Sequence, residues 1–312
     1  MIGYSRRVND LFSSQLKDWE LVRVNYGLLA KVKTRELDFG EFRILVQFNP
    51  ERMRSSTAKV DIKSIEERLC FLCSKNRPSE QSGVSFDKSM TFLVNPFPIF
   101  PRHLTIPSEL HIDQRIQDSF PAMLSLAEAI PDFVIFYNGP QCGASAPDHL
   151  HFQAGNKGFL PIEEDFAKGV NTRLISKKTG VEVWHWTGYL RGIMTLKGNN
   201  RTNLIRAFSL FFDKFSDFQP DKPEPMLNIL AYYYPDGWII HIIPRKIHRP
   251  CQFFAEGEMK ILLSPASVDL GGVIITPREE DFIKIKASDI ADIFDQVCLT
   301  DNEIPGFFSD II

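Results

Sequence analysis

The sequence of 312 residues has little of what marks secreted, membrane-spanning or disulfide-stabilised proteins. It contains only five cysteines, and just two of them lie close together, so we expect no disulfide framework and a reducing compartment. No hydrophobic run approaches the length of a membrane-spanning helix. The residues after the N-terminus are polar and offer no hydrophobic segment of a signal peptide. These absences predict a cytoplasmic protein without a membrane partner.

An excess of charge of one sign is also missing. The formal net charge of −3 supplies no field that would attract a nucleic acid polymer. A single nucleotide is still a compatible ligand, because its binding needs only local hydrogen-bond donors. The hydrophobic content of 44% and the charged content of 24% are ordinary for a globular protein, and the length suits one large or two ordinary domains.

Hydrophobic periodicity predicts an α+β protein with strands and helices mixed along the chain. The expected strands span residues 21–32, 42–48, 91–95, 104–106, 133–137, 181–196 and 273–276, with a hairpin over 227–243. The expected helices span residues 61–69, 115–130, 201–215 and 289–297. A short echo between residues 99–107 and 242–250, which share Ile, Pro, Arg and a final Pro, indicates two related halves, residues 1–160 and 161–312.

The strongest local signal is Asp-His-Leu-His-Phe-Gln at residues 148–153, entered through a Gly/Ser/Pro loop at residues 143–147. If the run is a strand, His149, His151 and Gln153 line one face and the apolar residues between them line the other. Two imidazoles and an amide on one face make a plausible reactive surface. A structural metal site and ordinary satisfied polar residues are the alternatives.

A second signal is the C-x-x-C pair of Cys70 and Cys73. Two thiolates at this spacing can hold one tetrahedral zinc ion, which needs two further ligands. His103 and His149 are the candidates. A redox pair and two unligated core cysteines are the other interpretations.

A neutral imidazole is a competent nucleophile toward phosphorus, so a histidine on this strand could form a covalent nucleotidyl-histidine. Such a reaction needs donors around the α-phosphate to stabilise developing charge. The amides of Gln153 and Asn138, the hydroxyl of Ser145 and the backbone N–H groups near Gly143 are the candidate donors.

The His-x-His-x-Gln run resembles the active-site strand of the histidine-triad superfamily in its transferase branch, where the hydrolase branch has a third His. The resemblance implies two histidine-triad-like halves, each a mainly antiparallel sheet with packed helices, and His151 as the nucleophile. Galactose-1-phosphate uridylyltransferases carry a zinc set in which Cys70, Cys73, His103 and His149 occupy the same places in the same order. The implied zinc is structural, because such a set leaves no open position for water.

Different stretches of the sequence resemble families that use different acceptors. Leu150 stands where the uridylyltransferases usually have Pro, and His-Leu-His-Phe-Gln is closer to nucleoside-diphosphate-hexose phosphorylases. Residues 138–145 resemble dinucleoside tetraphosphate phosphorylases. The expected substrate is therefore a nucleotide or nucleotide sugar, and the acceptor is inorganic phosphate or a sugar phosphate. A non-catalytic nucleotide-binding or nucleotide-sugar-binding protein on the same fold is the alternative, and a homodimer is compatible with the resemblance.

Three further segments have weaker signals. Residues 95–98, His103 and His111 resemble the segment of the superfamily that cradles the ribose, in which Asn95 is either a ribose contact or a polar turn residue. Residues 264–272 resemble a Gly-containing loop of the tetraphosphate phosphorylases, and spacing alone assigns it no role. A basic cluster binds a second phosphate or is a solvated loop; its members are Arg245, Lys246, His248 and Arg249.

Overall fold

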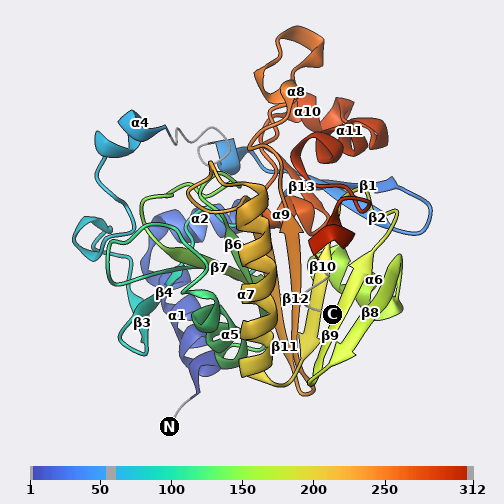
Figure 1. Cartoon of the computed structure of the whole chain (residues 1–312). Helices are drawn as coiled ribbons and strands as arrows, with labels where there is room; N and C mark the ends of the chain where they lie inside the picture. Colours follow the sequence, from blue (N-terminus) through green and yellow to red (C-terminus); the bar gives the residue numbers. More distant parts are fainter. Residues whose placement is uncertain (1–2, 54–60, 308–312) are drawn as a thin grey trace.

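The computed structural model describes residues 3–53 and 61–307 (Figure 1). Most of its strands form one ten-stranded sheet with the order β3-β4-β5-β7-β6-β11-β12-β10-β9-β8. Every neighbouring pair in this sheet is antiparallel. A three-stranded sheet, β1-β2-β13, lies apart from it. The predicted α+β class is confirmed.

The large sheet consists of β3 (Gly83–Phe86), β4 (Met90–Val94), β5 (His103–Pro107), β6 (Phe133–Asn138), β7 (His151–Asn156), β8 (Thr172–Lys178), β9 (Val181–Trp186), β10 (Met194–Gly198), β11 (Leu227–Tyr234) and β12 (Gly237–Pro244). The small sheet consists of β1 (Lys33–Asp38), β2 (Arg43–Phe48) and β13 (Val273–Thr276). The α-helices are α1 (Tyr4–Asp18), α2 (Glu20–Leu29), α4 (Ile62–Glu66), α5 (Phe120–Ala129), α6 (Pro161–Lys168), α7 (Arg201–Phe218), α8 (Cys251–Phe254), α9 (Ser267–Leu270), α10 (Glu279–Lys284) and α11 (Ala287–Val297).

The strand order repeats. Counted from its outer edge, the first half of the large sheet runs β3-β4-β5-β7-β6 and the second half runs β8-β9-β10-β12-β11. The repeat includes the helices, because α5 connects β5 to β6 and α7 connects β10 to β11. The two halves join through the antiparallel pair β6–β11, so they share one sheet instead of each closing its own. We propose the division at residues 160 and 161, which falls between β7 and α6.

The nine-residue echo does not mark equivalent positions in this repeat. Residues 99–107 lead into and form β5, whereas residues 242–250 end β12 and leave it. The counterpart of β12 is β7, and the counterpart of β5 is β10. The echo is therefore a chance similarity, although the duplication that it indicated is present in the strand order.

Both faces of the large sheet are buried. Along β6, Ile135 and Tyr137 belong to a core that contains residues of α1, α2, α5 and α7. Val134 and Phe136 point to the opposite face and belong to a second core, formed with residues of the small sheet and of α9, α10 and α11. In Figure 1, α5 and α7 lie in front of the sheet. The residues of β7 alternate in the same way, so Phe152 and Ala154 join the first core.

Most predicted elements are confirmed, including the helix that Asp61 caps by accepting a hydrogen bond from the Ser64 amide. The predicted strand over residues 21–32 is wrong, because Glu20–Leu29 forms helix α2. Its inward residues, Val22, Asn25 and Tyr26, recur at helical spacing. The predicted strand over residues 181–196 is two strands, β9 and β10. Within the described residues, no helix combines the length and the hydrophobicity that crossing a membrane requires.

Candidate active site

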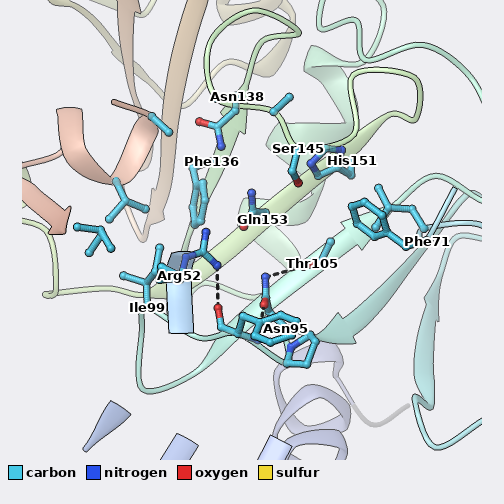
Figure 2. Close-up of a pocket in the computed structure, with 18 of the residues that line it drawn as sticks. Arg52, Phe71, Asn95, Ile99, Thr105, Phe136, Asn138, Ser145, His151 and Gln153 are labelled. Carbon is cyan, nitrogen blue, oxygen red and sulfur yellow. Dashed lines mark hydrogen bonds between the residues drawn. The ribbon is translucent and has the colours of Figure 1, made fainter. Parts of the chain in front are cut away.

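A cavity of about 800 Å³ lies between the two halves of the chain. It opens on the sheet face that carries the second core, to which Phe136 contributes. Figure 2 shows side chains from β6, β7 and the segment before β5 around it. The structure brings together here the six residues predicted to bind the nucleotide or its phosphate or to take part in catalysis: Asn95, Asn138, Gly143, Ser145, His151 and Gln153.

His151 is the first residue of β7, and its side chain is buried against the cavity wall. Its Nδ1 lies 2.8 Å from the backbone carbonyl oxygen of His149. Because a carbonyl oxygen only accepts, Nδ1 carries the proton and Nε2 keeps a free lone pair. Burial lowers the pKa of His151 to about 4, so the ring is neutral at neutral pH. This is the tautomer and the charge state of a nucleophile.

Gln114 holds the backbone at His151 in place, and no pattern in the sequence singles it out. This fully buried side chain accepts a hydrogen bond from the His151 amide at 2.7 Å. Its own amide donates to the carbonyl oxygens of Asn138 at 2.9 Å and His151 at 3.0 Å. Gln114 therefore ties the end of β6 to the start of β7. It lies in an irregular segment, where a single Gln has no pattern to distinguish it.

Asn138 ends β6 with its side-chain oxygen fully engaged. Its Oδ1 accepts from the Ser267 backbone amide at 2.9 Å and from Asn228 Nδ2 at 2.8 Å. Because a backbone amide only donates, the assignment of oxygen and nitrogen is fixed. The nitrogen end of Asn138 points toward the interior of the cavity (Figure 2) and has no hydrogen-bond partner among the described residues. The loop at residues 264–272, which had no assigned role, thus orients a donor in the first half.

Only part of the basic cluster at residues 245–249 lines the cavity, and the rest bonds to other parts of the protein. The Arg245 side chain is fully buried and donates to Asn228 Oδ1 at 2.8 Å and to the Pro265 carbonyl at 2.9 Å, so it supports the loop and cannot reach a ligand. Lys246 pairs with Glu303 at 3.1 Å. Only His248 and Arg249 line the cavity.

Asn95 holds the turn that follows β4. Its Oδ1 accepts from the Phe97 amide at 2.9 Å, and its Nδ2 donates to Thr105 Oγ1 at 3.0 Å (Figure 2). These bonds favour the interpretation of Asn95 as a polar turn residue. Arg52, which the sequence did not single out, lines the cavity next to this turn and donates to the Phe97 carbonyl at 2.8 Å.

Four potential metal ligands lie close together near the start of β7: Cys70, Cys73, His111 and His149. Their ligand atoms all lie within 4.8 Å of one another. His149 Nδ1 is 3.3 Å from the sulfur of Cys70 and 3.6 Å from that of Cys73, and His111 Nδ1 is 3.2 Å from the sulfur of Cys73. In a tetrahedral zinc site with ordinary bond lengths, neighbouring ligand atoms are about 3.5 Å apart. The cluster therefore has the composition and the size of a metal site.

The surroundings of the cluster also suit a cation. The Nε2 of His149 donates to the Ser108 carbonyl at 2.8 Å, which leaves Nδ1 as the ligand atom. The Nε2 of His111 lies 3.7 Å from a carboxylate oxygen of Asp148. Burial alone would raise the pKa of the Cys70 thiol, but the adjacent His149 ring and nearby backbone amides lower it to about 6. The cluster is thus prepared to supply a thiolate.

His103 is not part of this cluster, so its prediction as a metal ligand is wrong. Its ring is buried in the sheet, where Nδ1 accepts from the Ile99 amide and Nε2 contacts Gln153. Both nitrogens are engaged and neither is available to a metal. His111, eight residues further on and predicted near the ribose, takes the place among the ligands.

Two family profiles match the chain. The one described as a domain of unknown function, DUF4922, matches residues 11–156, and the one described as GDPGP1-like, C-terminal domain, matches residues 166–307. A galactose-1-phosphate uridylyltransferase of Staphylococcus saprophyticus is 25% identical over 206 residues, which span 60% of this chain and 40% of that enzyme.

The fold extends the similarity to the whole chain. The crystal structure of yeast Ap4A phosphorylase Apa2 in complex with Ap4A matches with a TM-score of 0.61 at 15% identity, covering 95% of this chain and 97% of that one. A second structure of this protein, in complex with AMP, matches with a TM-score of 0.54 at 16% identity over 91% of this chain and 96% of that one. The chain thus matches both domain families and shares the fold of this phosphorylase. Among the described residues, the His-x-His pair leads into β7, and the counterpart strand β12 has no such pair.

A substitution of Gly143 tests how closely its loop and the loop of Ala266 must approach each other at the cavity. Its φ is +95°, and a Cβ added there would lie 2.6 Å from the Cβ of Ala266. We expect Gly143→Ala to lower both the melting temperature and ligand affinity, and Ala266→Gly in the same chain to recover part of the loss. Gly158→Ala is the matched control, because Gly158 also has a positive φ but open space around it, and should cost about 1–2 kcal/mol in unfolding free energy. Equal losses at Gly143 and Gly158 would contradict the close approach.

The metal cluster makes a prediction about composition. Elemental analysis of the purified protein should find one bound metal ion per chain, and Cys73→Ser should lose it and lower the melting temperature. Cys251→Ser is the control, because Cys251 is exposed and lies outside the cluster. A stable, metal-free wild-type protein would refute the site.

Proposed function

We propose that this protein transfers a nucleotidyl group through a covalent intermediate on His151. The proposal rests above all on one observation: a neutral His151 ring, with its lone pair on Nε2, lies in the wall of a cavity large enough for a nucleotide. The fold shared with an Ap4A phosphorylase supports it, as does the sequence similarity to a uridylyltransferase.

In the first step, Nε2 of His151 attacks the α-phosphorus of the donor. An N–P bond forms while the P–O bond to the leaving phosphate group breaks, and the leaving oxygen takes the electron pair. In the second step an oxygen of the acceptor phosphate attacks the same phosphorus and the N–P bond breaks, which regenerates the neutral imidazole. The bond from Nδ1 to the His149 carbonyl holds the ring and favours the positive charge that develops on it during attack.

The negative charge that develops on the phosphoryl oxygens requires donors that are already oriented. In this proposal the amide nitrogens of Asn138 and Gln153 supply two of them, and the Ser145 hydroxyl supplies a third. All three side chains line the cavity with His151 (Figure 2). Gln153 has no ring nitrogen with which to protonate a leaving group or activate water, which favours transfer over hydrolysis.

The acceptor in this proposal is inorganic phosphate or a sugar phosphate. His248 and Arg249 line the same cavity from the second half of the chain, where a cation suits a second phosphate group. The two classes of relative divide on this point, since one is named a phosphorylase and the other a uridylyltransferase. The base and the sugar of the donor are left open.

We propose that the metal is a structural zinc. With four protein ligands the ion has no open position, so it supplies no chemistry to the reaction. Its place in the proposal is to hold His149, whose carbonyl oxygen orients the nucleophile two residues later.

The nucleophile is tested by substitution. We expect His151→Ala to reduce turnover by at least about 10⁴-fold, in line with the loss of a covalent nucleophile, with any of a panel of nucleoside-diphosphate sugars and dinucleoside tetraphosphates that the wild type accepts. His185→Ala is the control, because this histidine lies on β9 and bonds to the Asp301 carbonyl, outside the cavity. Turnover that survives in His151→Ala would sink the mechanism.

The acceptor subsite is tested by a pair of cations. Arg249→Ala should raise the KM for the acceptor about tenfold or more, because a hydrogen bond to a charged group contributes about 1.5–3 kcal/mol. Lys246→Ala, two positions before the cavity-lining pair and engaged with Glu303, should leave it nearly unchanged. An equal effect of both substitutions would indicate general electrostatics instead of a subsite.

A further inference from the structure

His103 is a fully buried histidine whose two ring nitrogens have distinct partners. The backbone amide of Ile99 donates to its Nδ1 at 3.2 Å. Because that amide can only donate, Nδ1 must carry the lone pair that accepts the bond, and Nε2 carries the proton. Burial lowers the pKa of His103 to about 3, so the ring stays neutral and has a single N–H to offer.

That N–H determines how Gln153 is oriented. His103 Nε2 lies 3.0 Å from Gln153 Oε1, so the oxygen end of the amide accepts and the nitrogen end is turned away. In Figure 2 the nitrogen of Gln153 points toward the side of the cavity where Ser145 and His151 lie. It has no hydrogen-bond partner among the described residues, so both of its hydrogens are available to a ligand.

An amide has nearly the same shape when it is turned by 180°, so packing alone selects its orientation weakly. The turned orientation would present an oxygen to a phosphate, which repels it. At Asn138 the Ser267 backbone amide prevents this by occupying the oxygen. At Gln153 no backbone amide of the described residues occupies the oxygen. Instead the Ile99 amide keeps the proton of the His103 ring on Nε2, and this N–H donates to the Gln153 oxygen.

We propose that His103 is a positioning residue that keeps the Gln153 amide turned with its nitrogen toward the transferred phosphoryl group. The identity of the ligand as a phosphoryl group rests on the proposed function, whereas the orientation of the Gln153 amide does not. His103 acts only through Gln153, because its ring lies behind that side chain and is not itself among the residues that line the cavity.

Three substitutions separate the two hydrogen bonds of the ring. His103→Gln places a donor near the position of Nε2 and should keep kcat close to that of the wild type. His103→Asn places an acceptor near the position of Nδ1 but is too short to reach Gln153. It should lower kcat about 10-fold to 100-fold, as should His103→Leu, with a smaller change in KM. These losses stay below the roughly 10²–10³-fold cost of removing a transition-state donor outright.

A double-mutant cycle decides whether the effect passes through Gln153. In a Gln153→Ala background, His103→Leu should have no further effect on kcat. His241→Leu is the control for packing, because His241 is another fully buried histidine of the large sheet and contacts Thr195 instead of the cavity. It should lower the melting temperature and leave kcat unchanged. An undiminished loss in the Gln153→Ala background, or no rescue by His103→Gln, would overturn the proposal.

The orientation can be read without any turnover. The ¹⁵N shifts of the His103 ring should show the proton on Nε2, and the side-chain amide resonances of Gln153 should move in His103→Asn but much less in His103→Gln. A proton on Nδ1 would overturn the proposal. If the wild type transfers no nucleotidyl group but these spectra appear as expected, the proposed function fails while the positioning of Gln153 stands.

Discussion

The hydrogen bond from the His151 ring to the carbonyl oxygen of His149 determines which nitrogen of the ring is free. The bond is local, yet it depends on distant parts of the chain. The His149 side chain is held by the cysteine cluster, and the start of β7 is held by Gln114. The candidate metal cluster and the cavity are thus connected: the cluster holds the His149 backbone carbonyl, and that carbonyl orients the proposed nucleophile in the cavity wall.

The donors around His151 follow a common rule. Asn138 and Gln153 each have the amide oxygen satisfied inside the protein and the amide nitrogen left for a ligand, through Ser267 at Asn138 and through His103 at Gln153. A site built in this way is preorganised for negative charge, because its dipoles need not turn when the charge develops. The second half of the chain contributes the loop at residues 264–272 and the pair His248 and Arg249. Its strand β12 has the position of β7 in the repeat but no His-x-His pair.

The sequence alone was sufficient to predict features that depend on hydrophobic periodicity or on residues close together in the chain. Alternation along residues 149–154 correctly placed His151 and Gln153 opposite Phe152, and the Gly/Ser/Pro loop marked the cavity wall. It failed where partners are distant in the chain. His103 and His111 both follow prolines near one strand, and only the three-dimensional path shows which reaches the cysteines. Gln114 and Ser267 act through backbone contacts that no sequence pattern records, and α2 resembled a strand because its composition is rich in Leu, Val and Tyr.

The central claim is a covalent bond between His151 and a nucleotidyl group, and intact-protein mass spectrometry tests it most directly. The protein would be mixed with each donor in turn without acceptor, quenched within seconds and weighed, and the modified peptide would be mapped. We expect a gain of one nucleoside monophosphate on His151 that disappears when phosphate or a sugar phosphate is added. Turnover without any adduct, or an adduct on another residue, would contradict the account.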